Sequence, residues 1–197
     1  MQTLILARHG ESEYSSRGLL NGDPSVDVEL TSVGEEQARV LGRTLESVEL
    51  DLCVVTELRR TRRTAELALA GREVTFETWP SLNDPRAGAF EGGRLDEYRD
   101  WAWAAGSSEV PGGGESRLAV VTRYAAAYRA LLDRPEASIL AVVHALPIAY
   151  LLAALEGEPP AARMDRPVEY AVAHSVDAGR LDAAVAVLAA WCASPTW

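Results

Sequence analysis

Arg8 and His9 stand side by side near the start of the chain, directly after the apolar run Thr3 to Ala7. That run predicts a buried strand, and α/β proteins place ligand-binding groups where such strands end. The charge of Arg8 disfavours protonation of His9, so a neutral ring nitrogen stays available as a nucleophile near neutral pH. The guanidinium matches phosphate oxygens, and Gly10 is expected to let the backbone approach a ligand closely or adopt a positive φ. The alternative is a surface arginine beside a polar residue at a strand end.

Two further predicted strands also end at polar residues. Arg60 follows the apolar run Leu52 to Val55, and His144 follows Ile139 to Val143. The carboxyl ends of parallel strands meet at one edge of a sheet, so these side chains are expected to converge with those of the first strand. Taken singly, each favours the interpretation as an ordinary helix-start or strand-end residue. Their joint placement predicts a phosphate-binding pocket.

The run Arg59-Arg60-Thr61-Arg62-Arg63 has two interpretations. It could form a nucleic-acid patch, or a solvated helix face from which Arg60 alone turns inward. A formal net charge of −10 and an isoelectric point near 4.8 oppose attraction to nucleic acid or to an anionic membrane. We therefore expect Arg60 to face the pocket, and a small phosphomonoester, rather than nucleic acid or a membrane, to be the partner.

Apolar periodicity predicts the elements that position these residues. The pattern favours an α/β fold, a three-layer sandwich with a mostly parallel central sheet and helices on both faces. The first helix is expected to begin with a capping box at Ser32 and Glu35. The expected elements that follow Leu52 to Val55 are helix Leu58–Ala70, strand Val74–Phe76, helix Glu115–Leu132, strand Ile139–Val143, helix Leu146–Leu155, and two candidate strands, Tyr170–Val176 and Leu181–Leu188.

The length of 197 residues predicts a single domain, in which residues 80–114 form a small cap insertion. This segment is rich in glycine and proline and also contains Tyr98, Trp101 and Trp103. Its aromatic residues either line the entrance to the pocket or pack the cap onto the core. The oligomeric state stays open, with a homodimer as one candidate.

Several features favour a cytoplasmic protein without a cofactor. Cys53 and Cys192 form neither a disulfide framework nor a metal-ligand spacing. His174 has no histidine or carboxylate at ligand spacing and is interpreted as structural. No signal peptide is visible at the start, and the longest apolar runs fall short of the roughly 18 residues needed to span a bilayer.

Several segments together resemble one known family. They are Leu6 to Ser12; Leu30-Thr31 with Gly34, Gln37 and Ala38; Thr56 to Thr61 with Thr64-Ala65; Leu82 to Asp84 with Gly88 and Phe90 to Gly92; Pro111 with Gly114 to Ser116; and Val142 to His144. In this order they are similar to the motifs of the histidine phosphatase superfamily, the phosphoglycerate mutase-like proteins. The resemblance spans most of residues 3 to 156.

The resemblance implies a phosphoric monoester hydrolase. In this interpretation a metal-independent phosphomonoesterase hydrolyses a small phosphorylated metabolite through a phosphohistidine formed on His9. Asp84 is the implied proton donor, and Arg8, Arg60 and His144 cradle the phosphoryl oxygens. The predicted substrate-binding residues are Arg8, His9, Ser15, Asn21, Gly22, Arg60, Asp84, His144 and Ala145.

Three residues depart from the family pattern and leave substrate preference open. Asp84 replaces the usual glutamate, Ala145 replaces a glycine, and Ser15 replaces an asparagine found in many members. Two alternative functions remain at this point. One is a phosphoglycerate mutase-type phosphoryl transferase, and the other is a module that binds phospho-ligands without turnover.

Overall fold

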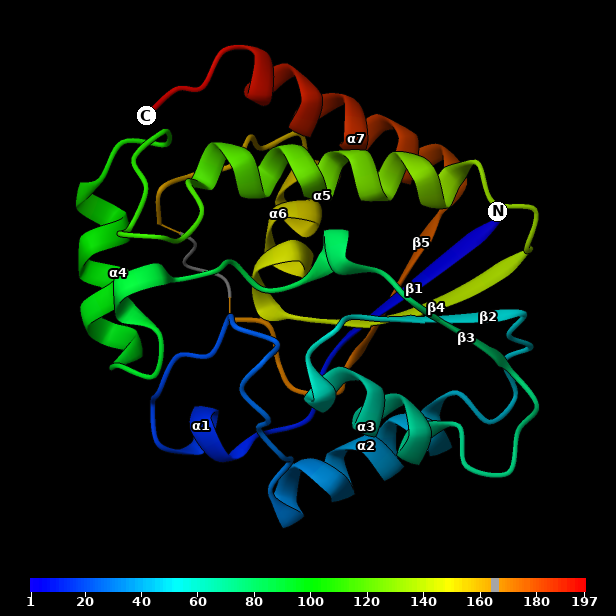
Figure 1. Ribbon diagram of the computed structural model, residues 1–197. Coiled ribbons are helices and arrows are strands. Elements are labelled where there is room, and N and C mark those ends of the chain that lie inside the picture. The colour runs from blue at the N-terminus through cyan, green and yellow to red at the C-terminus, as the bar shows by residue number, and fades with distance from the viewer. Residues whose placement is uncertain (164–166) are drawn as a thin grey trace.

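The computed structural model describes residues 1–163 and 167–197, and the strands in these ranges form one mixed sheet. The strand order is β3-β2-β4-β1-β5 (Figure 1). Strand β1 runs parallel to β4, as β2 does to β3 and β4, whereas β5 pairs antiparallel with β1. This confirms the predicted α/β fold with a mostly parallel sheet. The bounds are β1 (Thr3–Arg8), β2 (Leu52–Val55), β3 (Thr75–Thr78), β4 (Ser138–Val143) and β5 (Ala173–Asp177).

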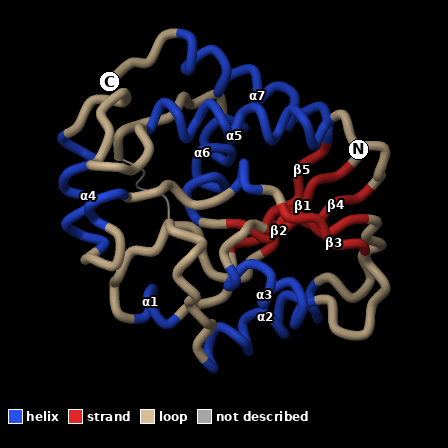
Figure 2. Tube along the Cα trace, viewed as in Figure 1, coloured by secondary structure: helices blue, strands red, loops and turns tan. Residues whose placement is uncertain are grey.

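Helices cover both faces of the sheet, as Figure 2 shows. Helices α2 (Ser32–Thr44) and α3 (Arg59–Ala68) pack on one face, while α5 (Arg117–Leu132), α6 (Ala145–Leu155) and α7 (Ala178–Ala193) form the other layer. Alternate residues of a strand point to opposite faces, so Leu4 and Leu6 of β1 pack with the second layer and Ile5 and Ala7 with the first. Within the described ranges, no helix is both long and apolar enough to cross a membrane.

Two irregular segments lie beyond the carboxyl edge of the sheet (Figure 1). One is the loop after β1, which contains the short helix α1 (Glu13–Ser16). The other, between β3 and α5, contains the 3-10 turns η1 (Pro80–Leu82) and η2 (Gly88–Phe90) and helix α4 (Leu95–Ala104). Within it, Phe90, Tyr98 and Trp101 form an aromatic cluster with ring centroids 5.7 to 5.9 Å apart. Trp101 therefore packs this segment together.

The structure corrects two expectations about elements. The run Leu181–Leu188 is not a strand, because it lies inside α7. The side chain of Asp177 caps that helix by accepting from the backbone N–H of Arg180, and its alanine-rich composition favours a helix. The first long helix is capped by Thr31 and not by Ser32: Thr31 Oγ1 accepts from Gly34 N over 3.0 Å. The Tyr170–Val176 prediction is confirmed in part, since β5 begins at Ala173.

Candidate active site

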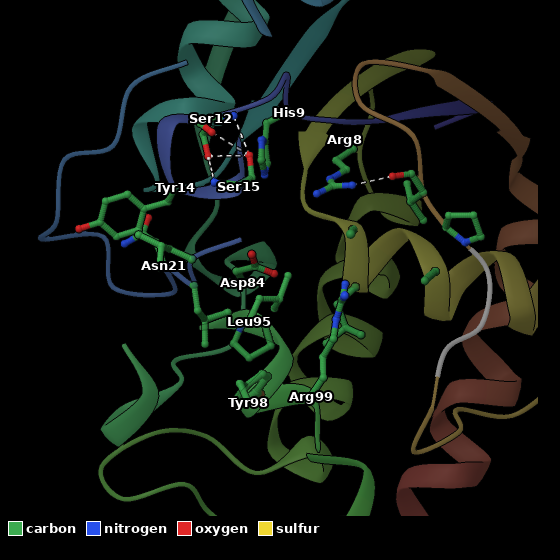
Figure 3. A pocket seen from close by; sticks show the side chains of 18 of the residues that line it. Arg8, His9, Ser12, Tyr14, Ser15, Asn21, Asp84, Leu95, Tyr98 and Arg99 are labelled. Atoms are coloured by element: carbon green, nitrogen blue, oxygen red, sulfur yellow. Dashed lines mark hydrogen bonds between the residues drawn. The ribbon is translucent and has the colours of Figure 1, made fainter. Parts of the chain in front are cut away.

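A cavity of about 600 Å³ opens where β1 and β4 end, between the α1 loop, α3, α4 and α6 (Figure 3). His144 lies behind its wall, fully buried, with its ring centroid 5.3 Å from that of His9. Gly22 is the other predicted site residue that does not line the cavity, and it follows Asn21, which does. The predicted residues that line the cavity are Arg8, His9, Ser15, Asn21, Arg60, Asp84 and Ala145.

His9 is held in one tautomer by two neighbours. Its Nδ1 lies 2.7 Å from the carbonyl oxygen of Gly10, which can only accept, so Nδ1 carries the proton. Arg60 Nε donates to His9 Nε2 over 3.0 Å, so that nitrogen presents a lone pair. Burial, together with the charges of Arg60 and Arg8, holds the pKa of His9 well below its usual range. The unprotonated nitrogen of a neutral imidazole therefore lies beside two guanidinium groups.

Arg60 is the centre of the hydrogen-bond network. It is almost fully buried at the start of α3. Besides His9, it donates from Nη1 to Asn21 Oδ1 at 2.5 Å, and from Nη2 to Asn21 O at 2.9 Å and to Asp84 Oδ2 at 3.1 Å. A network of this kind fixes the guanidinium in the cavity wall.

The other arginines of the run lie on the surface. Arg59 pairs with Asp27 and Glu29, each at 2.7 Å. Arg62 lies 3.9 Å from Glu66, and Arg63 lies 2.7 Å from Glu35. The expected orientation, with Arg60 inward and its neighbours outward, is confirmed, and these neighbours are engaged by carboxylates instead of forming a free basic patch.

A chain of hydroxyl groups orients His144. Its Nδ1 lies 3.3 Å from Arg60 Nη2, and its Nε2 lies 3.0 Å from Thr56 Oγ1. Thr61 Oγ1 donates to Leu58 O over 2.9 Å and lies 3.1 Å from Thr56 Oγ1. Burial first, then the charge of Arg60, holds the pKa of His144 well below its usual range. Nδ1 is therefore the nitrogen turned toward the reacting groups.

Asp84 is the carboxylate among the described cavity-lining residues. Its side chain is 25% exposed, and Oδ2 lies 3.6 Å from His144 Nδ1. Burial raises the pKa of Asp84, although the charge of Arg60 opposes the rise. Two other carboxylates of the motif segments are engaged elsewhere: Glu11 accepts from Thr31 Oγ1 at 2.8 Å, and Glu91 from Gly22 N at 2.8 Å.

Arg8 is fixed from the chain that precedes β5. Its Nη1 donates to Val168 O over 2.8 Å, and its guanidinium lies 3.7 Å from the ring centroid of Tyr170. Its Nε is buried without a hydrogen-bond partner in the described ranges. Arg8 therefore lines the cavity with its guanidinium fixed by a carbonyl and a tyrosine ring, and Figure 3 shows its hydrogen bond to the chain before β5.

Two glycines lie directly against the backbone of neighbouring segments. A Cβ on Gly10 would lie 2.3 Å from Gly34 O, so the loop after β1 touches the backbone of α2. Gly10 also has no positive φ, so that expectation was wrong, whereas close approach of its backbone to a ligand stays a prediction. A Cβ on Gly22 would lie 1.9 Å from Pro85 O, which explains why this position needs glycine although it lies outside the cavity.

Some predicted binding residues act mainly on other residues in this structure. Asn21 accepts from Arg60 and donates from Nδ2 to Asp23 O over 3.0 Å, so it positions the arginine. Ser15 forms a capping box with Ser12 while lining the cavity. Ala145 is the first residue of α6 and lines the cavity. His174 lies on β5, with Nε2 buried and without a partner in the described ranges, and does not line the cavity.

Sequence reasoning missed several residues around the cavity. Arg99 and Arg117 line it, and Tyr170 stacks on Arg8. These residues lie in or after segments without a strong periodic signal, and their position depends on how those segments pack. Thr56 follows β2 directly, so the strand-end argument that identified His144 could also have found it. Within the described ranges, no group of three His, Cys, Asp or Glu side chains is arranged to hold a metal ion.

Comparison with known proteins agrees with the fold and with the family resemblance. The family described as "Histidine phosphatase superfamily (branch 1)" matches residues 4–188, and the chain belongs to this superfamily. The crystal structure of the alpha-ribazole phosphatase from Shigella flexneri superposes with a TM-score of 0.77 and 30% sequence identity, covering 89% of this chain and 90% of that chain.

Two curated relatives carry different names. "Probable phosphoglycerate mutase GpmB" of Photorhabdus laumondii subsp. laumondii is 31% identical over 170 residues, which is 81% of this chain and 77% of that protein. "Fructose-2,6-bisphosphatase TIGAR B" of Danio rerio is 32% identical over 138 residues, 66% of this chain. The match spans about half, 53%, of the zebrafish protein. The relatives thus share a family and not one substrate.

Proposed function

We propose that the protein is a metal-independent phosphoric monoester hydrolase that acts on a small phosphorylated metabolite through a phosphohistidine. The observation that carries the proposal is the unprotonated Nε2 of His9, which lies beside the guanidinium groups of Arg8 and Arg60 in the cavity wall. Such a nitrogen is an uncharged nucleophile, and the two arginines match the charge of a phosphoryl dianion.

In the first step, Nε2 of His9 gives up its hydrogen bond from Arg60 Nε, its lone pair attacks phosphorus, and the bond from phosphorus to the ester oxygen breaks. Arg8, Arg60 and His144 hold the three non-bridging oxygens, and Asp84 gives its proton to the departing alkoxide. The raised pKa of Asp84 supports this role, because a general acid must hold its proton at the working pH. The products are an alcohol and the phosphohistidine.

In the second step, the carboxylate left on Asp84 takes a proton from water as its oxygen attacks phosphorus. The bond from phosphorus to Nε2 breaks, and inorganic phosphate forms. Positioning and charge neutralisation supply most of what phosphoryl transfer requires. Arginines and a histidine meet that requirement here without a metal ion.

The role of residues 80–114 as a cap is part of this proposal. Leu95, Tyr98, Arg99 and Trp103 of α4 line the cavity, which supports a role in substrate selection. Trp101 instead packs against Phe90 and Tyr98, so Trp103 fits the first interpretation of the aromatic residues, Trp101 fits the second, and Tyr98 fits both. The single domain with residues 80–114 as its insertion, the cytoplasmic setting and the homodimer stay predictions.

The test is direct trapping of the intermediate. Incubation with a labelled phosphomonoester and quenching in alkali should leave acid-labile phosphate on His9. The variant His9→Ala should neither trap phosphate nor turn over substrate, while His174→Ala, altered at a histidine outside the cavity, serves as the matched control. Phosphate on a serine, or unimpaired turnover by His9→Ala, would overturn the assignment.

The same experiment separates hydrolysis from its two alternatives. A mutase would return the phosphoryl group to a second hydroxyl, so isomerised phosphate ester would accumulate in place of inorganic phosphate. The name of the Photorhabdus relative makes this alternative specific. A module that only binds phospho-ligands would show neither product nor phosphohistidine.

A further inference from the structure

The cavity carries more positive charge than one phosphoryl group requires. Among its described lining residues are five arginines and a single carboxylate, although the whole chain has a formal net charge of −10. Arg8 and Arg60 lie beside His9. Arg163 stacks on Trp103 at 4.6 Å. Arg99 and Arg117 are left without an assigned role.

Arg117 lies at the cavity and has no ion-pair partner among the carboxylates of the described residues. Its Nη1 donates to the hydroxyl of Tyr150 over 3.1 Å, and its guanidinium carbon lies 5.7 Å from the Tyr98 ring centroid. Its Nε is shielded from solvent and has no hydrogen-bond partner in the described ranges. Tyrosine hydroxyls and rings are neutral, so they do not cancel the charge. A partly buried cation with a free donor is costly unless a ligand completes it.

Arg99 approaches the same space from the cap. Leu95, Arg99 and Trp103 are spaced four residues apart on α4, so they share one face of the helix, and all three line the cavity. Figure 3 shows the Arg99 side chain extending from α4 toward Arg8. The charge of Arg99 also contributes to lowering the pKa of Arg8, which agrees with that proximity. Arg99 forms no ion pair in the described part of the chain.

The size of the cavity allows a ligand larger than phosphate. Small-molecule sites typically enclose about 300 to 1,000 Å³, and this one encloses about 600 Å³. A phosphoryl group on Arg8 and Arg60 would leave the space between α4 and the start of α5 for the rest of the substrate.

We infer that Arg99 and Arg117 form a second anion subsite, so that the substrate is a phosphomonoester bearing a further carboxylate or phosphate group. This inference rests on the proposed phosphatase function for the position of the first phosphoryl group. Arginine donates bidentately to either anion, so the chemistry shared by the two is what the subsite recognises. The second group makes no bond in the reaction and serves to select and orient the substrate.

The test compares matched substrates that differ in the second charge. Two pairs differ by a carboxylate, at two distances from the phosphate: 3-phosphoglycerate with glycerol 3-phosphate, and 6-phosphogluconate with glucose 6-phosphate. Fructose 1,6-bisphosphate against fructose 6-phosphate adds a phosphate. We expect kcat/KM to favour the more highly charged member of at least one pair by about 10-fold to 100-fold, the range of charge-assisted hydrogen bonds. The pair with the largest preference identifies the anion and its spacing.

Variants then assign that preference to the two arginines. Arg99→Gln and Arg117→Gln should each reduce the ratio of kcat/KM within the preferred pair toward one. Arg117→Lys should retain part of that preference. Arg94→Gln is the matched control, because Arg94 is exposed beside α4, pairs with Asp96 and does not line the cavity. Arg99→Gln alters an exposed side chain, so it decides the question even if Arg117→Gln fails to fold.

Two results would overturn the inference while leaving the phosphatase intact. One is equal kcat/KM within every pair for the unaltered protein, and the other is an equal loss on both members of a pair in Arg99→Gln and Arg117→Lys. If no substrate is hydrolysed and no phosphohistidine forms, the proposed function fails instead. Calorimetric Kd values for the same pairs then still show whether the second charge is bound.

Discussion

Arg60 donates from Nε directly to Nε2 of His9 over 3.0 Å, so a permanent cation faces the nitrogen assigned as the nucleophile. The contact explains two properties of His9 at once. It fixes the lone pair on Nε2, and it adds to burial in holding the pKa of His9 below its usual range. A proton on that nitrogen would face the guanidinium and would abolish nucleophilicity.

Arg60 should matter far more than Arg59. The variant Arg60→Ala is expected to lower kcat/KM by on the order of 100-fold to 1,000-fold, as for loss of one partner of transition-state charge. Arg59→Ala removes surface ion pairs with Asp27 and Glu29, which contribute little. Steady-state kinetics on both variants checks the prediction. Equal losses would show that the network around Arg60 has no special part in turnover.

Asp84→Asn should discriminate between leaving groups. An alkyl phosphate needs a proton on its departing oxygen, whereas an aryl phosphate with an acidic phenol does not. The phosphorylation burst is therefore expected to collapse for the alkyl ester and to persist for the aryl ester, with dephosphorylation slowed for both. Rapid-quench measurements separate the two steps. The same fractional loss in both bursts would make Asp84 a positioning residue.

Acidification should destabilise the fold through the two histidines of the site. The pKa values of His9 and His144 are held well below 6.5 in the folded protein. As pH falls below about 6.5, the unfolded chain binds protons that the folded chain does not, so the free energy of unfolding decreases. The slope is at most about 1.4 kcal/mol per pH unit for each histidine.

Urea unfolding between about pH 7.5 and pH 5.5 measures this slope. His144→Gln should make it smaller. Asp84 acts in the opposite direction, because its pKa is raised on folding and its contribution to stability is lost as pH rises through that raised value. Repeating the series in Asp84→Asn isolates the histidines. Stability that stays constant or rises on acidification in that variant would contradict the prediction.

Gly10→Ala should destabilise the protein although no hydrogen bond is removed. The added Cβ would lie 2.3 Å from Gly34 O, so the loop that carries His9 must move away from α2. Overpacking typically costs about 1–3 kcal/mol. Gly112→Ala is the control, because its Cβ would meet only Ala89 at 3.7 Å. Thermal unfolding compares them, and similar midpoints would show that the close approach is not required.

Activity should survive exhaustive chelation. The proposed mechanism neutralises the phosphoryl oxygens with Arg8, Arg60 and His144, so removal of divalent ions should leave kcat/KM unchanged. Assays after dialysis against a strong chelator test this. Loss of turnover that a divalent ion restores would replace the proposed mechanism with one that depends on a metal.

The strand-end residues were predictable because topology alone brings them together. Arg8, His9 and His144 follow apolar runs, and parallel strands deliver such residues to one edge whatever the details of packing. The strand predicted at Leu181–Leu188 was wrong because a continuous apolar run has no period that separates a strand from a buried helix. For such a run, the N-cap at Asp177 was the informative signal.

Residues that act through contacts between distant segments could not be predicted. The role of Asn21 depends on the α1 loop meeting α3, and that of Tyr170 on the chain before β5 meeting Arg8. In the sequence Arg117 is an ordinary first residue of a helix, and its place in the site depends on contacts with α4 and Tyr150. Neither periodicity nor local spacing predicts such tertiary contacts.

The hydrogen bond between Arg60 and Asp84 means that a phosphoryl group entering the cavity would compete with Asp84 for the Arg60 donor. Nη2 of Arg60 donates to the Asp84 carboxylate. A phosphoryl oxygen that takes this donor displaces the carboxylate, and its negative charge offsets the cation that had opposed the raised pKa. Asp84 then gains affinity for a proton only when there is an ester beside it to receive one. Binding of the substrate would itself favour protonation of Asp84, and departure of phosphate would restore the hydrogen bond between Asp84 and Arg60.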